Sequence, residues 1–275
     1  TRFKCDWSSD VCSSDLPLTF SGSTTGRSFY TNFVTYSDVT IDASGGAITV
    51  QTDLTCNVLT LTAGGLTIAN GVEVVVTSFN SSNSNVRSLT FGTGNWQVTG
   101  SGASWNCANS TNLTVSYVPG STVMYFTASS GVDFYGGGKS WPYILNSLTG
   151  SGTTSSTNVL TIQDGGNTFY AVSVGANSGK SRGIKFPGPY TTTILNDFIL
   201  AGLSGALVYI GSTNASAATV SKASGTVSAS YTSISYSTAT GGARFEAYSS
   251  NGNVDGGNNT GWQFSQGSGN FMAFF

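Results

Sequence analysis

Apolar residues alternate with polar ones along most of this chain, in short runs that glycine, serine, asparagine and aspartate separate. From about residue 37 onward these runs are rich in β-branched and aromatic residues, as in Leu59-Thr60-Leu61-Thr62. A period of two residues is typical of β-strands, because successive side chains of a strand point to opposite faces. No stretch repeats apolar residues at helical spacing between capping residues. The pattern therefore predicts an all-β fold.

The spacing of the runs indicates how the strands are connected. Asn-Gly and Asp-Gly pairs, which favour tight hairpins, are too few to join so many strands. Groups of three strands recur about every 20 to 28 residues, a solenoid period, and Thr, Ser and Asn fill outward positions where stacked side chains can hydrogen-bond as ladders. We expect a right-handed, single-stranded parallel β-helix of about six to seven coils. The alternative is an antiparallel β-sandwich or barrel.

The first residues are not expected to belong to this fold. Residues 6–16, Asp-Trp-Ser-Ser-Asp-Val-Cys-Ser-Ser-Asp-Leu, resemble the translation of a common sequencing adapter, so residues 1–16 are expected to be an unstructured artefact. Residues 17–36 are expected to form an N-terminal cap or lead-in. Residues 37–275 contain no proline-rich or charged linker and are expected to form one β-solenoid domain, with a C-terminal cap near residues 239–264.

Charge and composition exclude several classes of function. Only 8% of the residues are charged, with 10 Lys and Arg against 12 Asp and Glu, so no basic patch for nucleic acid is expected. The chain has no histidine, which excludes Ser-His and Cys-His catalytic pairs. No apolar run of about 18 residues is present, so no membrane span is expected. Cys56 and Cys107 are too far apart for a CxxC motif and are expected to be free in the core; a disulfide is the alternative.

An aromatic segment at residues 132–143 interrupts the regular pattern. Its Trp141-Pro142 step cannot continue a ladder of backbone hydrogen bonds, so we expect a corner or a loop there. Exposed Tyr135, Trp141 and Tyr143 would stack on sugar rings and are our candidates for glycan contact. The alternative is that Trp141 and Tyr143 fill the core together with Phe134.

A β-helix that cleaves polysaccharides would need carboxylates that converge, either as a catalytic pair or around calcium. The acidic residues are dispersed in the sequence, and Asp133, Asp164 and Asp197 are the candidates if successive coils bring them together. Two Asp-Gly-Gly-Asn units, at 164–167 and 255–258, lack the spacing of known calcium loops and are expected to be turns. No metal site is predicted, although these units leave calcium binding open.

The C-terminal segment carries the most distinctive motif. It runs from Ala239-Thr240-Gly241-Gly242 to Asp255-Gly256-Gly257-Asn258-Asn259-Thr260-Gly261-Trp262. It resembles the closing segment of β-helical proteins of phage tails and bacterial surfaces, in which Trp262 and Phe264 would cap the open end of the core. The resemblance implies an extracellular, cell-surface or virion location, and it identifies no site residue.

Two functions from different classes are therefore expected. The first is a non-enzymatic structural or binding β-solenoid, a phage tail component or an adhesin, that contacts polysaccharide or a host cell surface and assembles as a homotrimer. Low charge, the lack of histidine and the polar outward positions favour it. The alternative is a glycan-degrading lyase or hydrolase that uses Asp133, Asp164 or Asp197.

Overall fold

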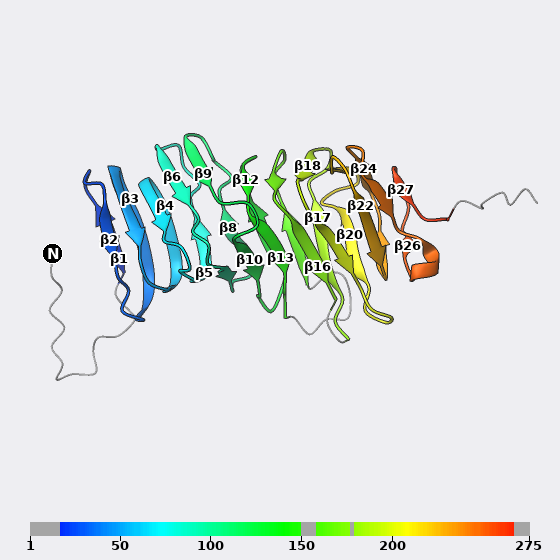
Figure 1. Ribbon diagram of the computed structural model, residues 1–275, viewed down its shortest axis with the longest axis horizontal. Coiled ribbons are helices and arrows are strands. Elements are labelled where there is room, and N and C mark those ends of the chain that lie inside the picture. Colours follow the sequence, from blue (N-terminus) through cyan, green and yellow to red (C-terminus); the bar gives the residue numbers. More distant parts are fainter. Residues whose placement is uncertain (1–16, 150–157, 177–178, 267–275) are drawn as a thin grey trace, which may run out of the picture.

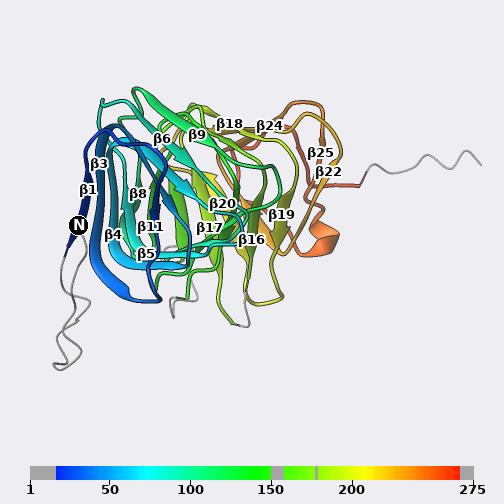
Figure 2. The same cartoon turned by 60° about the vertical axis from the view of Figure 1, so that its left-hand side comes forward.

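The structure is a computed structural model that describes residues 17–149, 158–176 and 179–266, and its fold is a parallel β-helix. The strands stack along one long axis in the order of the sequence (Figure 1). Figure 2 shows the same coils winding around that common axis. Every pairing between two strands of the described residues is parallel. The predicted fold class is confirmed, and the antiparallel alternative does not occur.

Each coil contributes strands to three faces of the solenoid, which we call the first, second and third sheet. On the third face, β12, β15, β18, β21 and β24 pair with one another as a separate five-stranded sheet. The first sheet contains the starts of β3 (Thr35–Val50), β4 (Leu54–Ile68) and β5 (Val74–Asn80), then β7 (Trp96–Val98), β10 (Val123–Phe126), β13 (Tyr143–Asn146), β16 (Val172–Gly175), β19 (Phe198–Ala201), β22 (Thr226–Ser230), β25 (Arg244–Glu246) and β27 (Trp262–Gln263).

The second and third sheets follow the same order. The second contains β1 (Leu18–Ser21), the middle of β3 and β4, the end of β5, β8 (Gly102–Asn106), β11 (Val132–Tyr135), β14 (Val159–Ile162), β17 (Arg182–Phe186), β20 (Val208–Ser212), β23 (Thr232–Ile234) and β26 (Val254–Asp255). The third contains β2 (Arg27–Phe29), the ends of β3 and β4, β6 (Arg87–Thr90), β9 (Leu113–Ser116), β12 (Ser140–Trp141), β15 (Thr168–Phe169), β18 (Thr191–Ile194), β21 (Ala218–Ser221) and β24 (Ser237–Thr240).

Helical structure is nearly absent. Within the described residues it is limited to one 3₁₀ turn, η1 (Ser249–Asn251). The same residues contain no helix with the length and apolar character needed to cross a membrane. Residues 17–36, expected to be a lead-in, hold β1 and β2, which pair with β3 and so begin the stack.

The coils are more numerous than the six or seven that we expected. Leu54 pairs with Val74, 20 residues later, and Trp96 pairs with Met124, 28 residues later, so the period matches the prediction. Strands β12 and β15 have two residues each and one buried side chain each, which leaves no alternation to detect. Nine coils of the described residues have a strand in all three sheets, and they begin at Thr35, Leu54, Val74, Trp96, Val123, Tyr143, Val172, Phe198 and Thr226.

Buried side chains of one coil pack directly on those of the next. On the second sheet Val39 pairs with Leu59, Leu59 with Phe79, and Phe79 with Trp105, and all of these residues are buried. Burying one such side chain contributes about 1.5 to 3 kcal/mol to folding. Stacking in register therefore builds one continuous core from coil to coil.

Alternation predicts an inward side chain correctly at most strands and incorrectly at Tyr170, Tyr209 and Tyr236, which are only half-buried. Beside Tyr170 and Tyr209 it is Phe169 and Val208 that are buried. Tyr170 and Tyr209 lie in continuous apolar runs, such as Leu207-Val208-Tyr209-Ile210. A continuous apolar run fits either register of a strand, so periodicity alone cannot decide which residues face the core.

Aromatic rings fill the middle of the core. The Trp105 ring lies 4.5 Å from Phe79 and 5.9 Å from Phe134, centroid to centroid. It meets Trp96 and Trp141 edge to face at 5.6 and 5.5 Å, the geometry that aromatic pairs prefer. At the C-terminal end Trp262 contacts Phe245 at 5.1 Å and donates its indole N–H to the Ser237 hydroxyl.

Arg87 is a buried cation without a carboxylate partner. Its guanidinium donates to the carbonyl oxygens of Ser81 and Asn85 in its own coil and of Asn109 and Thr111 in the next coil. Burial lowers its pKa below the ordinary arginine value. Because buried donors are costly when unpaired, these carbonyls must stay in place, and Arg87 joins the corners of two coils.

Glycines at some corners are required by the close approach of neighbouring coils. Gly64 has φ +83°, and a Cβ atom there would lie 2.0 Å from the Ala43 carbonyl oxygen of the previous coil. Gly71 also has a positive φ, +76°, but a Cβ atom there would meet no atom within 4 Å. The two glycines share the same backbone conformation but differ in the room available for a Cβ atom, so they form a matched pair for substitution.

We expect Gly64→Ala to destabilise the protein more than Gly71→Ala. Both variants place Ala in the left-handed region, which costs about 1 to 2 kcal/mol. Gly64→Ala adds steric overlap with backbone, which costs about 1 to 3 kcal/mol more. Urea unfolding followed by tryptophan fluorescence measures the difference. Equal losses of unfolding free energy in the two variants would contradict the proposed close packing at this corner.

Candidate functional site

The three candidate acids lie in different parts of the fold. Asp133 is half-buried on β11 of the second sheet and accepts a hydrogen bond of 2.7 Å from the Gln163 amide. Asp164 lies in the corner after β14, and Asp197 lies exposed in the corner before β19. The described residues contain no group of three Cys, Asp or Glu side chains placed to hold a metal ion. The coils therefore do not bring all three acids into one site.

Asp164 is held by the backbone of the previous coil. Its two carboxylate oxygens accept the N–H groups of Gly136 and Gly137 at 2.8 and 2.6 Å. Asn167 donates to the same carboxylate and accepts the N–H of Gly138. The Asp-Gly-Gly-Asn unit at 164–167 is therefore a turn that connects two corners.

The three candidate aromatic residues also separate. Trp141 is fully buried, donates its indole N–H to the Gly136 carbonyl and contacts Phe134 edge to face at 5.5 Å. Trp141 therefore fills the core, which was the alternative to glycan contact, and its ring is not accessible to a ligand. Tyr135 is half-buried on the second sheet, and Tyr143 is half-buried on the first. Only the two tyrosines remain candidates, and they lie on different faces.

Tyr143 has an aromatic neighbour on the outward face of the first sheet. Val123 pairs with Tyr143 and Tyr125 pairs with Leu145, so the two tyrosines are diagonal neighbours about 8 Å apart along the backbone grid. Tyr125 is not among the residues predicted from the sequence, although its buried neighbours Met124 and Phe126 imply by alternation that it faces outward.

The outward row that contains Tyr125 continues toward the C-terminus. Leu145 pairs with Ser173, and Ser173 pairs with exposed Ile199. The register of β19 with β22 extends the row to Ser228, Glu246 and Gln263. Asp197 precedes Phe198, the partner of Val172, and therefore lies at the edge of the same sheet. We call this outward surface, from β10 to β27, the tyrosine face.

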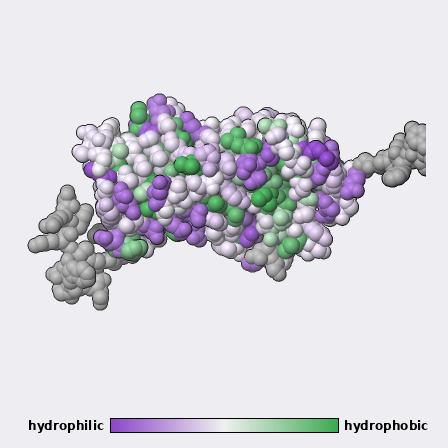
Figure 3. Space-filling view, viewed as in Figure 1, coloured by the Kyte–Doolittle hydropathy of each residue, from purple (hydrophilic) through white to green (hydrophobic). Residues whose placement is uncertain are grey.

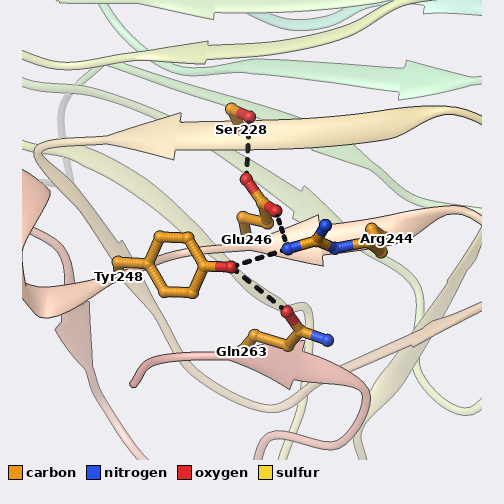
Figure 4. A network of polar contacts seen from close by, with 5 residues as sticks. All are labelled: Ser228, Arg244, Glu246, Tyr248 and Gln263. Atoms are coloured by element: carbon orange, nitrogen blue, oxygen red, sulfur yellow. Dashed lines mark hydrogen bonds and ion pairs between the residues drawn. The ribbon is translucent and has the colours of Figure 1, made fainter. Parts of the chain in front are cut away.

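A polar network closes the C-terminal end of the tyrosine face (Figure 4). Arg244 pairs with the Glu246 carboxylate and donates to the Tyr248 hydroxyl at 2.9 Å. That hydroxyl donates to the Gln263 side-chain oxygen at 3.3 Å, and Glu246 accepts from the Ser228 hydroxyl at 3.4 Å. The Tyr248 hydroxyl and, next, the Glu246 carboxylate raise the pKa of Arg244. The network therefore presents a permanent cation beside a carboxylate on an open surface.

Arg244 remains available to a ligand although it is paired. Its side chain is 61% exposed, whereas that of Glu246 is 18% exposed. Both of its contacts use one terminal nitrogen, which leaves the other guanidinium N–H groups facing solvent. The sequence did not predict this network, because its members Tyr248 and Gln263 lie outside the strand that carries Arg244 and Glu246. The number of residues in the coil determines that Arg244, Tyr248 and Gln263 lie next to one another.

The surface offers flat faces and shallow depressions. Figure 3 shows hydrophobic residues in patches among neutral and hydrophilic ones on one side of the solenoid. Two depressions of about 340 and 270 Å³ lie at the N-terminal coils and are lined by residues such as Asn57 and Asp53. Neither contains a residue of the tyrosine face.

Comparisons with protein-family models, with curated protein sequences and with solved structures found no match. The assignment of a function therefore depends on the geometry of this chain.

The two cysteines in the described residues are buried and free, as predicted. Burial raises the pKa of the Cys56 thiol to about 12, and the nearby carboxylate of Asp38 adds to the effect. Burial also raises the pKa of Cys107, against the opposing influence of Arg87. Neither thiol is a nucleophile in the folded protein, because a nucleophile must be a thiolate.

We expect the free energy of unfolding to fall as the pH rises from about 9 toward 12. An unfolded thiol ionises near pH 8.5, about three units below folded Cys56, so the unfolded state releases a proton that the folded state keeps. Cys56→Ala removes this difference, so its stability should fall less steeply, by up to about 1.4 kcal/mol per pH unit. Urea unfolding at several pH values compares the slopes. Identical slopes would contradict the raised pKa.

Proposed function

We propose that this protein is a non-enzymatic β-solenoid of a phage tail or a bacterial surface that binds glycans on its tyrosine face. The observation that carries the proposal is that Tyr125, Tyr143 and the Arg244 network lie on the outward side of one sheet. The resemblance of the C-terminal segment to such proteins supports an extracellular, cell-surface or virion location. A homotrimer is part of the same proposal.

The chemistry of the tyrosine face suits a sugar chain. Tyrosine rings stack on the apolar faces of pyranose rings, and their hydroxyl groups stay available for hydrogen bonds. Arginine, glutamate and glutamine side chains supply fixed donors and acceptors for sugar hydroxyl groups. Coils repeat about every 4.8 Å, so an extended glycan that lies along the face would contact side chains of successive coils.

The arrangement of the acids favours binding without cleavage. Retaining and inverting hydrolases need two carboxyl groups about 5 to 10 Å apart around one glycosidic bond. Asp164 is occupied by two backbone N–H groups, and Asp133 lies on a different sheet from Asp197. On the tyrosine face, Glu246 is held by Arg244 and Ser228. The glycan-degrading alternative would require these groups to rearrange.

Tyr143→Ala should weaken glycan binding about tenfold, because it removes a stacking contact of about 1 to 1.5 kcal/mol. The full chain is first screened on an array of bacterial surface glycans, and the affinity for a positive glycan is then measured by calorimetry. Tyr135→Ala, on the second sheet, is the matched control and should bind normally.

Three outcomes would contradict the proposal. A folded wild-type protein that binds no glycan removes its basis. An equal loss in Tyr143→Ala and Tyr135→Ala places the site elsewhere. Release of new reducing ends from a bound glycan by the wild-type protein favours the enzyme.

A further inference from the structure

The third sheet presents a regular grid of hydroxyl groups. Its strands β12, β15, β18, β21 and β24 contain no charged residue, and all their outward residues are Ser or Thr. One row follows the register through Ser140, Thr168, Thr193, Ser221 and Thr240. A second row follows it through Thr191, Thr219, Thr238 and Thr260. We call these two rows the hydroxyl grid.

The hydroxyl grid has two fixed spacings. Adjacent coils are about 4.8 Å apart, and residues i and i+2 of one strand, such as Thr191 and Thr193, are about 6.6 Å apart. No register shift interrupts the four pairings of this sheet. The inward residues of the same strands, among them Trp141, Phe169 and Ile194, are fully buried and hold the backbone in place. The grid is therefore regular in both directions and rigid.

The hydroxyl groups of the grid are free for a ligand. We expected stacked Ser and Thr side chains to hydrogen-bond with one another as ladders, but the described residues show no such bonds within the grid. Among the described residues of the grid, Ser140 alone has a side chain with a hydrogen-bond partner: it shares a 2.8 Å hydrogen bond with the Tyr117 hydroxyl. Threonine is stiff at χ1, so each free hydroxyl and its neighbouring methyl group lose little entropy on binding.

A rigid two-dimensional grid fits a ligand that is itself periodic and uncharged. A sugar surface is recognised with aromatic rings, and the outward positions of these five strands have none. A charged side chain would keep its own hydration shell at such a surface, and none interrupts the grid. Water in a crystal lattice offers hydrogen-bond donors and acceptors at regular spacings of similar length to those of the grid.

We propose that the hydroxyl grid of the third sheet binds the surface of ice. The hydroxyl groups would join the hydrogen-bond lattice of the outermost water layer, and the threonine methyl groups would fill the spaces between them. This surface is separate from the tyrosine face, so the two proposals stand or fall independently. A separate row of Ser and Thr follows the register of the N-terminal strands through Ser28, Thr49, Thr67, Thr90 and Ser116.

Ice affinity of the full chain tests this proposal. The measurements are thermal hysteresis, the gap between the melting and freezing points of a single ice crystal, and partition of the protein into growing ice. The wild-type protein should show both. Thr193→Tyr places a bulky ring at the centre of the grid and should lose most of both activities. Thr161→Tyr, at a half-buried outward position of the second sheet, is the matched control and should keep them.

Thermal unfolding of each variant separates a lost surface from a lost fold. If Thr193→Tyr does not fold, Thr240→Tyr at an exposed grid position replaces it. The proposal is overturned if the folded wild-type protein shows no hysteresis and stays out of ice, or if the grid variant keeps full activity. It is also overturned if Thr161→Tyr abolishes the activity. Binding to crystalline cellulose that depends on Thr193, without ice affinity, would assign the grid to a solid polysaccharide.

Discussion

The packing of each buried side chain on its in-register neighbour in the next coil is the interaction on which this structure depends. A chain with 8% charged residues and one ion pair among its described residues gains little from electrostatics. Its stability comes instead from columns such as Val39, Leu59 and Phe79. Because the core fixes the register, outward residues also align from coil to coil, and both proposed binding surfaces result from that alignment.

The fold was largely predictable from the sequence, because alternation reports directly which residues face a core. Prediction failed where alternation was missing or ambiguous. The two-residue strands at Ser140–Trp141 and Thr168–Phe169 contain no full period, so alternation could not reveal them. The apolar run around Tyr209 fits two registers, and only packing against the neighbouring coils selects one.

The candidate site was predictable only in part. Tyr143 and Asp197 lie on or beside the tyrosine face, whereas Asp133 and Asp164 lie elsewhere and Trp141 is in the core. Which residues meet across coils depends on the length of every intervening turn, and a single residue more or less changes the neighbour. The contact between Tyr248 and Gln263 is therefore visible only in three dimensions.

Arg87 makes the solenoid less modular than its repeating strands suggest. In a stack of similar coils, evolution can lengthen or shorten a corner, or duplicate a whole coil, without disturbing the sheets. Arg87 depends on carbonyl oxygens in its own corner and in the corner of the next coil, near Asn109 and Thr111. A change of length in either corner would leave the buried guanidinium of Arg87 without hydrogen-bond acceptors. These two coils should therefore be inherited as one unit, while corners elsewhere vary.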